Sequence, residues 1–136
     1  MTVEAEIKTR LSDFAGLSAL ISDRIYPVTL PQNVEMPAVS YRRVSAERIS
    51  AMGVDTGLVR ARFQFDCWSG EHDDGTIGTF DEARAVAKQV RLALQRWRNT
   101  SGTVVQDTFM IGDQDLHEHD TETYHAALDF EIFYEE

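Results

Sequence analysis

The feature that most constrains the fold is an alternation of side chains over residues 58–68. Every second residue is apolar, and the residues between them are polar or charged. The apolar set is Val59, Ala61, Phe63, Phe65 and Cys67, and the polar set is Arg60, Arg62, Gln64 and Asp66. Because successive side chains of a strand point to opposite faces, this pattern predicts a β-strand with one buried face. The fold must therefore contain a sheet that is covered on at least one side.

Three further segments are predicted as strands. Residues 38–44 come first, and we expect them to form a hairpin with residues 58–68. The 13 residues between them, 45–57, are too many for a tight turn, so they predict a long loop of the kind that is often functional. The remaining strands are expected over residues 103–111 and 121–134. In the last strand, one face should be buried and the opposite face largely wet; the buried face is Tyr124, Ala126, Leu128, Phe130, Ile132 and Tyr134.

Two helices are predicted on apolar periodicity. The first spans residues 3–17, where apolar residues recur at helical spacing. The second spans residues 79–98, and Thr79 with Glu82 forms a capping box at its start. Its expected buried stripe is Phe80, Ala83, Val86, Ala87, Val90, Leu94 and Trp97. The predicted order is α-β-β-α-β-β, an α+β fold with a mostly antiparallel sheet and helices packed on one face.

Length and charge narrow the function. The 136 residues suit a single domain, 1–136. The net charge is −10; residues 1–98 hold all 13 basic residues and 13 acids, whereas residues 99–136 hold ten acids and no Lys or Arg. Since binding to a nucleic-acid backbone needs positive charge, DNA binding through the C-terminal third is disfavoured.

The sequence predicts a protein made in the cytoplasm without a membrane anchor. It has no apolar run of about 20 residues, and acids stand where a secretory signal would carry basic residues. The single cysteine, Cys67, fits a reducing compartment and lies on the buried side of its strand, as an inert core thiol would. No nucleophile motif, P-loop or dinucleotide fingerprint is present, so neither an enzyme activity nor a cofactor is expected.

One segment offers ligands for a metal ion. His117 and His119 lie two residues apart among carboxylates, and His72 or His125 could add a further ligand. On an extended segment both imidazoles would project to the same side. The pattern is more typical of a solvated acidic hairpin loop, so no metal site is expected; a small metal-binding module or enzyme is the alternative.

Two groups of basic residues are candidate interaction surfaces. Arg84, Lys88 and Arg91 recur at helical spacing on the second helix, as a docking face for acids or as a solvated helix face. The hairpin carries a second cluster, composed of Arg42, Arg43, Arg48, Arg60 and Arg62. A row of arginines on one sheet face with acids elsewhere is typical of a self-assembling subunit, although an ordinary sheet surface can look the same.

The chain resembles the small tail-completion (tail terminator) proteins of long-tailed phages and of phage-derived gene transfer agents. The resemblance covers nearly the whole length and rests on fold-level signatures, not on catalytic motifs. These are an N-terminal helix, residues 24–27 (RIYP), residues 36–41 (MPAVSY), the strand 62–68, a helix with Ala83, Val90 and Leu94, and the final strand 128–132.

The resemblance implies a structural virion protein that forms a ring, typically a hexamer, at the head–tail junction. Such a ring caps the head-proximal end of the tail tube, stops its polymerisation and faces the head-closure or connector protein, while DNA passes through the lumen without specific binding. A ring contact joins two different patches, which the Arg-rich and the acidic parts of the chain could supply. We expect the loop 45–57, with Arg48, to reach a neighbour. The acidic loop, with Asp113, Asp115, Glu118 and Asp120, should line the lumen or face a partner. Another neck component, such as a head-closure or connector protein, is the alternative.

Overall fold

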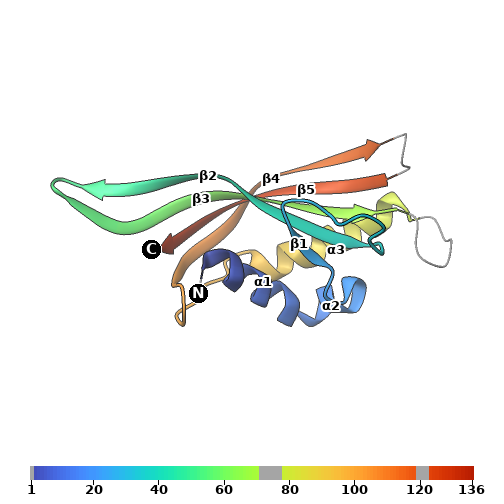
Figure 1. Ribbon diagram of the computed structural model, residues 1–136, viewed down its shortest axis with the longest axis horizontal. Coiled ribbons are helices and arrows are strands. Elements are labelled where there is room, and N and C mark those ends of the chain that lie inside the picture. Colours follow the sequence, from blue (N-terminus) through green and yellow to red (C-terminus); the bar gives the residue numbers. More distant parts are fainter. Residues whose placement is uncertain (1, 71–77, 119–122) are drawn as a thin grey trace.

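The computed structural model describes residues 2–70, 78–118 and 123–136, whose arrangement is shown in Figure 1. The elements in chain order are α1 (Val3–Asp13), α2 (Ala15–Ile21), β1 (Ile25–Pro27), β2 (Ala38–Ala51), β3 (Val54–Ser69), α3 (Phe80–Leu94), β4 (Val105–Glu118) and β5 (Thr123–Glu135). The predicted α+β class is confirmed. The structure adds one helix and one short strand, β1, to the predicted order.

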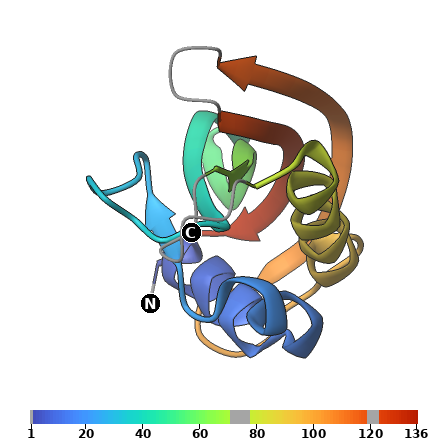
Figure 2. The same cartoon turned by 90° about the vertical axis from the view of Figure 1, so that its right-hand side faces the viewer.

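The strands form one sheet in the order β1-β2-β3-β5-β4. β1 runs parallel to β2, and all other neighbouring strands are antiparallel. The helices cover one face, here called the helix face, as predicted; the opposite, outer face carries no helix in the described ranges (Figure 1). Viewed along its long axis, the sheet is twisted and curled (Figure 2).

The core lies between the helix face and the helices, and β3 supplies its centre. All five apolar residues of the alternating pattern are buried, none more than 1% exposed. Phe65 meets Phe130 of β5 edge to face, with ring centroids 5.6 Å apart, a preferred aromatic geometry. Cys67 is fully buried, and this burial raises the pKa of its thiol, so the thiol stays protonated. The prediction of a buried core cysteine is confirmed.

The single helix expected over residues 3–17 is two helices. Thr2 caps α1 by accepting a hydrogen bond from the Ala5 N–H at 3.2 Å. The helix is interrupted at Phe14, whose backbone is extended, and α2 then packs against α3. Gly16 lies inside α2, where an added Cβ would collide with the Gln89 side chain of α3. The end of the flexible Gln89 side chain therefore occupies the space beside Gly16.

The start of the next helix, α3, is as predicted, but its end and its stripe differ. Thr79 Oγ1 accepts a hydrogen bond from the Glu82 N–H at 3.2 Å, which confirms the helix cap. The helix ends at Leu94, four residues before the expected end. Phe80 is 42% exposed and Trp97 lies beyond the helix, half-buried, so neither belongs to a fully buried stripe. No helix among the described residues is long and apolar enough to span a membrane.

The prediction of a long loop over residues 45–57 is wrong. β2 and β3 continue to pair as far as Ala51 and Val54, and the turn consists of Met52 and Gly53. Gly53 has φ +79°, a conformation that glycine adopts without strain. The alternation that predicts strands fails here because both faces of this stretch are exposed and carry polar residues.

β4 also extends further than expected, so part of the acidic segment that was predicted to be a loop is a strand. It runs to Glu118, so Asp113, Asp115 and Glu118 lie in a strand, whereas Asp120 is outside the described residues. The expectation of a wet outer face on β5 is wrong at one end. Thr123, His125 and Ala127 are buried there, and His125 stacks on Trp68 with ring centroids 4.1 Å apart.

Candidate assembly surfaces: a projecting hairpin and two sheet edges

The most prominent surface feature is the end of the β2–β3 hairpin, residues 44–58, here called the arm. It projects beyond the helices at one end of the molecule (Figure 1). Val44, Met52 and Val54 are all exposed on it, and Met52 at the turn is completely so. A two-stranded hairpin in water is marginally stable by itself, so the arm depends on local contacts or on a partner.

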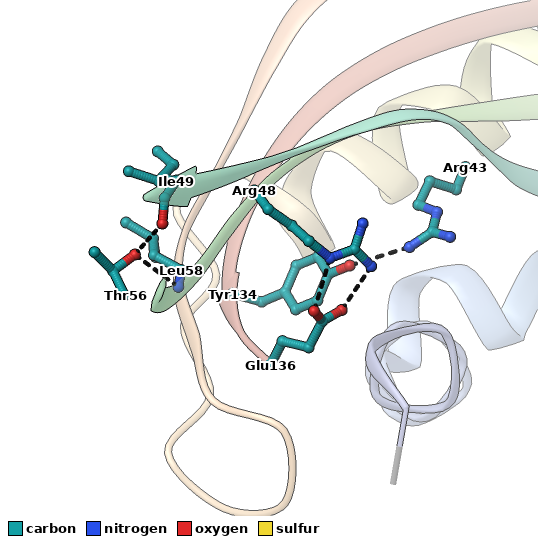
Figure 3. Close-up of polar contacts among 7 residues, drawn as sticks. All are labelled: Arg43, Arg48, Ile49, Thr56, Leu58, Tyr134 and Glu136. Carbon is teal, nitrogen blue, oxygen red and sulfur yellow. Dashed lines mark hydrogen bonds and ion pairs between the residues drawn. The ribbon is translucent and has the colours of Figure 1, made fainter. Parts of the chain in front are cut away.

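An ion pair holds the base of the arm (Figure 3). Arg48 donates from Nε and Nη2 to the two carboxylate oxygens of Glu136, at 2.8 and 2.9 Å. The backbone N–H of Glu136 also donates to the Gly57 carbonyl at 2.7 Å. This bidentate geometry holds the pKa of the Glu136 carboxyl below its ordinary value and raises the pKa of Arg48. Both side chains are about half exposed, so solvent screens the pair, and its role is to orient the arm.

Two further contacts shape the arm (Figure 3). The Thr56 hydroxyl donates to the Ile49 carbonyl and accepts from the Leu58 N–H, beside the register shift between Arg48 and Ser50. Near the base, Arg43 Nη1 donates to the Tyr134 hydroxyl at 3.2 Å. The hairpin is thus fixed to the end of β5 by two side chains of β2, Arg43 and Arg48, and by the backbone carbonyl of Gly57 in β3.

The five arginines of the hairpin do not form one row. Arg43 and Arg48 lie opposite Phe63 and Val59, so they belong to the helix face. The other three, Arg42, Arg60 and Arg62, belong to the outer face. The expectation of a single arginine face is therefore wrong. Arg42 and Arg43 are adjacent and so face opposite sides of the strand. The register shift between Arg43 and Ser45 places Arg48 on the helix face.

On the outer face, acids of the same chain already pair with these arginines. Arg60 lies 2.6 Å from Glu47 and 3.1 Å from Glu131. Arg62 lies 2.9 Å from Asp129. Arg42 donates to the Gln64 side chain at 3.3 Å. This surface is close to neutral and has the cross-strand pairing of an ordinary sheet face.

The basic face of α3 lies next to the acidic end of β4. Arg84 Nη1 is 3.1 Å from Asp115 and 3.5 Å from Asp113. Lys88 and Arg91 line the same groove. Asp113 and Asp115 of β4 thus share the guanidinium of Arg84, and Lys88 and Arg91 bring further positive charge to the same groove.

The structure does not assemble the metal ligands considered from the sequence. His117 and His125 lie on opposite faces of the sheet, because His117 pairs with Tyr124 and His125 with Leu116. The His117 ring stacks on Tyr124 with centroids 4.4 Å apart. His72 and His119 lie outside the described residues. Within the described ranges, no group of three or more His, Cys, Asp or Glu residues could hold a metal ion.

The two open edges of the sheet are features that the sequence analysis missed. β1 pairs with β2 only over residues 39–41, and the rest of the outer edge of β2 has no strand partner in the described part of the chain. β4 forms the opposite edge of the sheet. Both edge strands extend beyond the part that has buried apolar residues. The sequence gives only a weak signal for such an extension, because both of its faces are exposed to solvent.

A helix-covered sheet with a projecting arm and two open edges characterises a structural subunit built for assembly. The family model described as Tail completion protein gp17 matches residues 5–135. The chain therefore belongs to this family of structural tail proteins, which are not enzymes, and the resemblance inferred from the sequence is confirmed.

A comparison with solved structures agrees on the fold. A chain of a structure entitled "Virion of native gene transfer agent (GTA) particle" superposes with a TM-score of 0.72 at 18% identity. The match covers 96% of this chain and 92% of the other. No curated protein sequence matches the chain.

Proposed function

We propose that the protein is a ring-forming tail terminator, which caps the head-proximal end of the tail tube and joins it to the head-closure or connector protein. The observation that carries this proposal is the family match over residues 5–135. The likeness to a chain of a gene transfer agent virion supports it at the level of fold. The whole chain, 1–136, acts as one domain in this role.

The two edges of the sheet support a ring in particular. They differ in sequence and charge, and they lie on opposite sides of the molecule. Contact between two different patches of identical subunits is heterologous, and it closes into a ring when the rotation between subunits is suitable. Following the family resemblance, we propose a hexamer that binds the tail tube protein on one side and the connector on the other.

DNA passes through this ring without specific binding. The acids of β4, Asp113, Asp115 and Glu118, are proposed to face the lumen or a neighbouring subunit, as is Asp120. Negative charge at the lumen would repel the phosphate backbone and prevent the channel from retaining DNA. Among the basic residues, we place Arg42, Arg43 and Arg48 at the subunit interface, together with Arg84, Lys88 and Arg91. Arg60 and Arg62 are proposed to lie there too; like Arg48 and Arg84, they form ion pairs within the chain.

Electron microscopy of particles from cells that lack the protein tests this function. Overlong tails, or tails without heads, are the expected result, because nothing would stop the tube from growing. Filled heads beside detached tails of normal length would overturn tail termination and assign the protein to head closure. Normal particles would overturn both roles.

A further inference from the structure

We propose that subunits join by pairing the outer edge of the arm on one copy with the outer edge of β4 on the next, so that the sheet continues across the boundary. This inference rests on the proposed function, since it specifies how the ring is built. An open strand edge presents unpaired N–H and C=O groups, and an added strand satisfies them.

The open parts of the two edges are similar in length. On β2, residues 42–51 lie beyond the segment that pairs with β1. On β4, the connection from α3 covers the first part: Arg96 donates its N–H to the Thr108 carbonyl, and Gln95 accepts from the Met110 N–H. Residues 111–118 follow, and no strand covers their outer side in the part of the chain that the structure describes.

The charges of the two segments are complementary. Residues 42–51 contain three arginines and one glutamate. Residues 111–118 contain three acids and no lysine or arginine. Arg48 and Asp113 both belong to the helix face, because their strand partners Val59 and Leu128 are core residues. Joining the edges with the helix faces aligned would therefore bring opposite charges to the same side.

Strand direction also favours this joint. β2, β3, β5 and β4 alternate in direction, so β4 runs antiparallel to β2. When one sheet continues into an identical sheet of the same orientation, β4 meets the next β2 in the antiparallel arrangement, which gives the better-aligned hydrogen bonds. Four strands lie from β2 to β4 in the sheet order; an odd number there would have made these two edge strands parallel.

The register determines how neighbouring copies are offset. Within one sheet, Arg42 is level with Gly112, through Gln64 and Asp129. The open part of β2 therefore extends from this level toward one end of the sheet, and the open part of β4 extends toward the other. The two overlap only if the next copy is displaced along the strands, which a closed ring accommodates by tilting its strands relative to the axis.

Matching the faces selects residue pairs that can be tested. Ser45 and Leu116 both belong to the outer face, since they lie opposite Arg62 and His125. An antiparallel register that places Ser45 opposite Leu116 also places Arg48 opposite Asp113 on the helix face, as the charges require. In that register, cysteines at 45 and 116 of adjacent copies would be close enough to form a disulfide.

Disulfide cross-linking in assembled particles provides the test. Tails would be isolated from cells producing the double variant Ser45→Cys with Leu116→Cys, oxidised, and separated on a denaturing gel without reductant. The expected result is a ladder of covalent multimers up to the size of the ring. The matched control is Ser45→Cys with Leu92→Cys, since Leu92 is also exposed but lies on α3 and not on a strand edge. This control should remain monomeric.

The outcomes separate this inference from the function on which it rests. Tails of normal length that contain only monomeric double variant would overturn the edge pairing and leave tail termination intact. Multimers from the control as readily as from the test pair would also overturn it. Absence of the wild-type chain from isolated tails would overturn the proposed function and this inference together.

Discussion

Arg48 on the arm and Glu136 beyond β5 form a bidentate ion pair, although 88 positions separate them in the sequence. The pair connects the arm, whose residues are exposed or half-buried, to the end of β5, a strand that contributes several buried residues to the core. The orientation of the arm relative to the sheet therefore depends on one exposed, charge-assisted contact, together with the Glu136–Gly57 backbone bond.

The first prediction concerns this contact. Glu136→Ala should release the arm without unfolding the protein, because the pair contributes orientation and buries no core residue. Amide hydrogen exchange in residues 44–58 should accelerate several-fold, while exchange in the core segment of β3 stays unchanged. Glu35→Ala is the matched control, since it also removes a half-exposed partner of an arginine, Arg24, but lies outside the arm. Unchanged exchange in the arm of the Glu136 variant would contradict the assigned role.

The second prediction concerns pH. Arg48 lowers the pKa of Glu136 in the folded protein below its unfolded value, so the stabilisation is complete above the unfolded pKa, about 4.3 for a free glutamate. It should be lost as the pH falls through the folded pKa. An NMR titration of the Glu136 side chain should thus give a midpoint below that of a free glutamate. In the Arg48→Ala variant, the midpoint should rise. An identical midpoint in both proteins would show that Arg48 is not the cause.

The third prediction concerns the core. Phe130→Ala should lower the free energy of unfolding by about 3–5 kcal/mol, because it leaves a cavity beside Phe65. Phe133→Ala, three residues further along β5 on the outer face, is the control. It should lower the free energy of unfolding by less, since Phe133 is only half-buried. Denaturant unfolding measures both values. Similar losses in the two variants would contradict the assignment of the helix face as the core side.

The fourth prediction concerns Cys67. Because burial raises the pKa of its thiol and excludes solvent, the native protein should not react with a thiol reagent at pH 8. Stoichiometric labelling should appear only with unfolding, and its midpoint should coincide with that of the loss of tertiary structure. Rapid labelling of the native protein would show that the β3 core opens locally. The same result decides whether Cys67 needs replacing in the cross-linking experiment.

The α+β class and the core face of β3 were predictable because they depend on local patterns. The period of two from Val59 to Cys67 identifies a half-buried strand in any context. The Thr79 cap likewise identifies a helix start, because its hydrogen bond joins residues only three positions apart in the sequence. Family-level resemblance draws on the same signals, which is why it agreed with the family match.

The candidate assembly surfaces were less predictable. Neither the arm nor the second half of β4 has a regular alternation of apolar and polar residues, so both were predicted to be loops. Their strand structure comes from backbone ladders to β3 and β5, which are themselves held by the core. The face that Arg48 occupies depends on the register shift between Arg43 and Ser45, which alternation counted along the sequence does not detect.

The sequence by itself therefore determined which apolar residues of β3 are buried and where α3 begins. It also determined that the C-terminal part of the chain holds acids and no arginines. It did not indicate that Asp66 and Ser69 of β3 are buried as well. Only the tertiary structure decided how far the hairpin extends, which edges of the sheet stay open and which acid each arginine meets. The physical reason is range. Burial patterns and helix caps act over a few residues, whereas strand pairing and ion pairs such as Arg48–Glu136 join residues that only the folded sheet brings together.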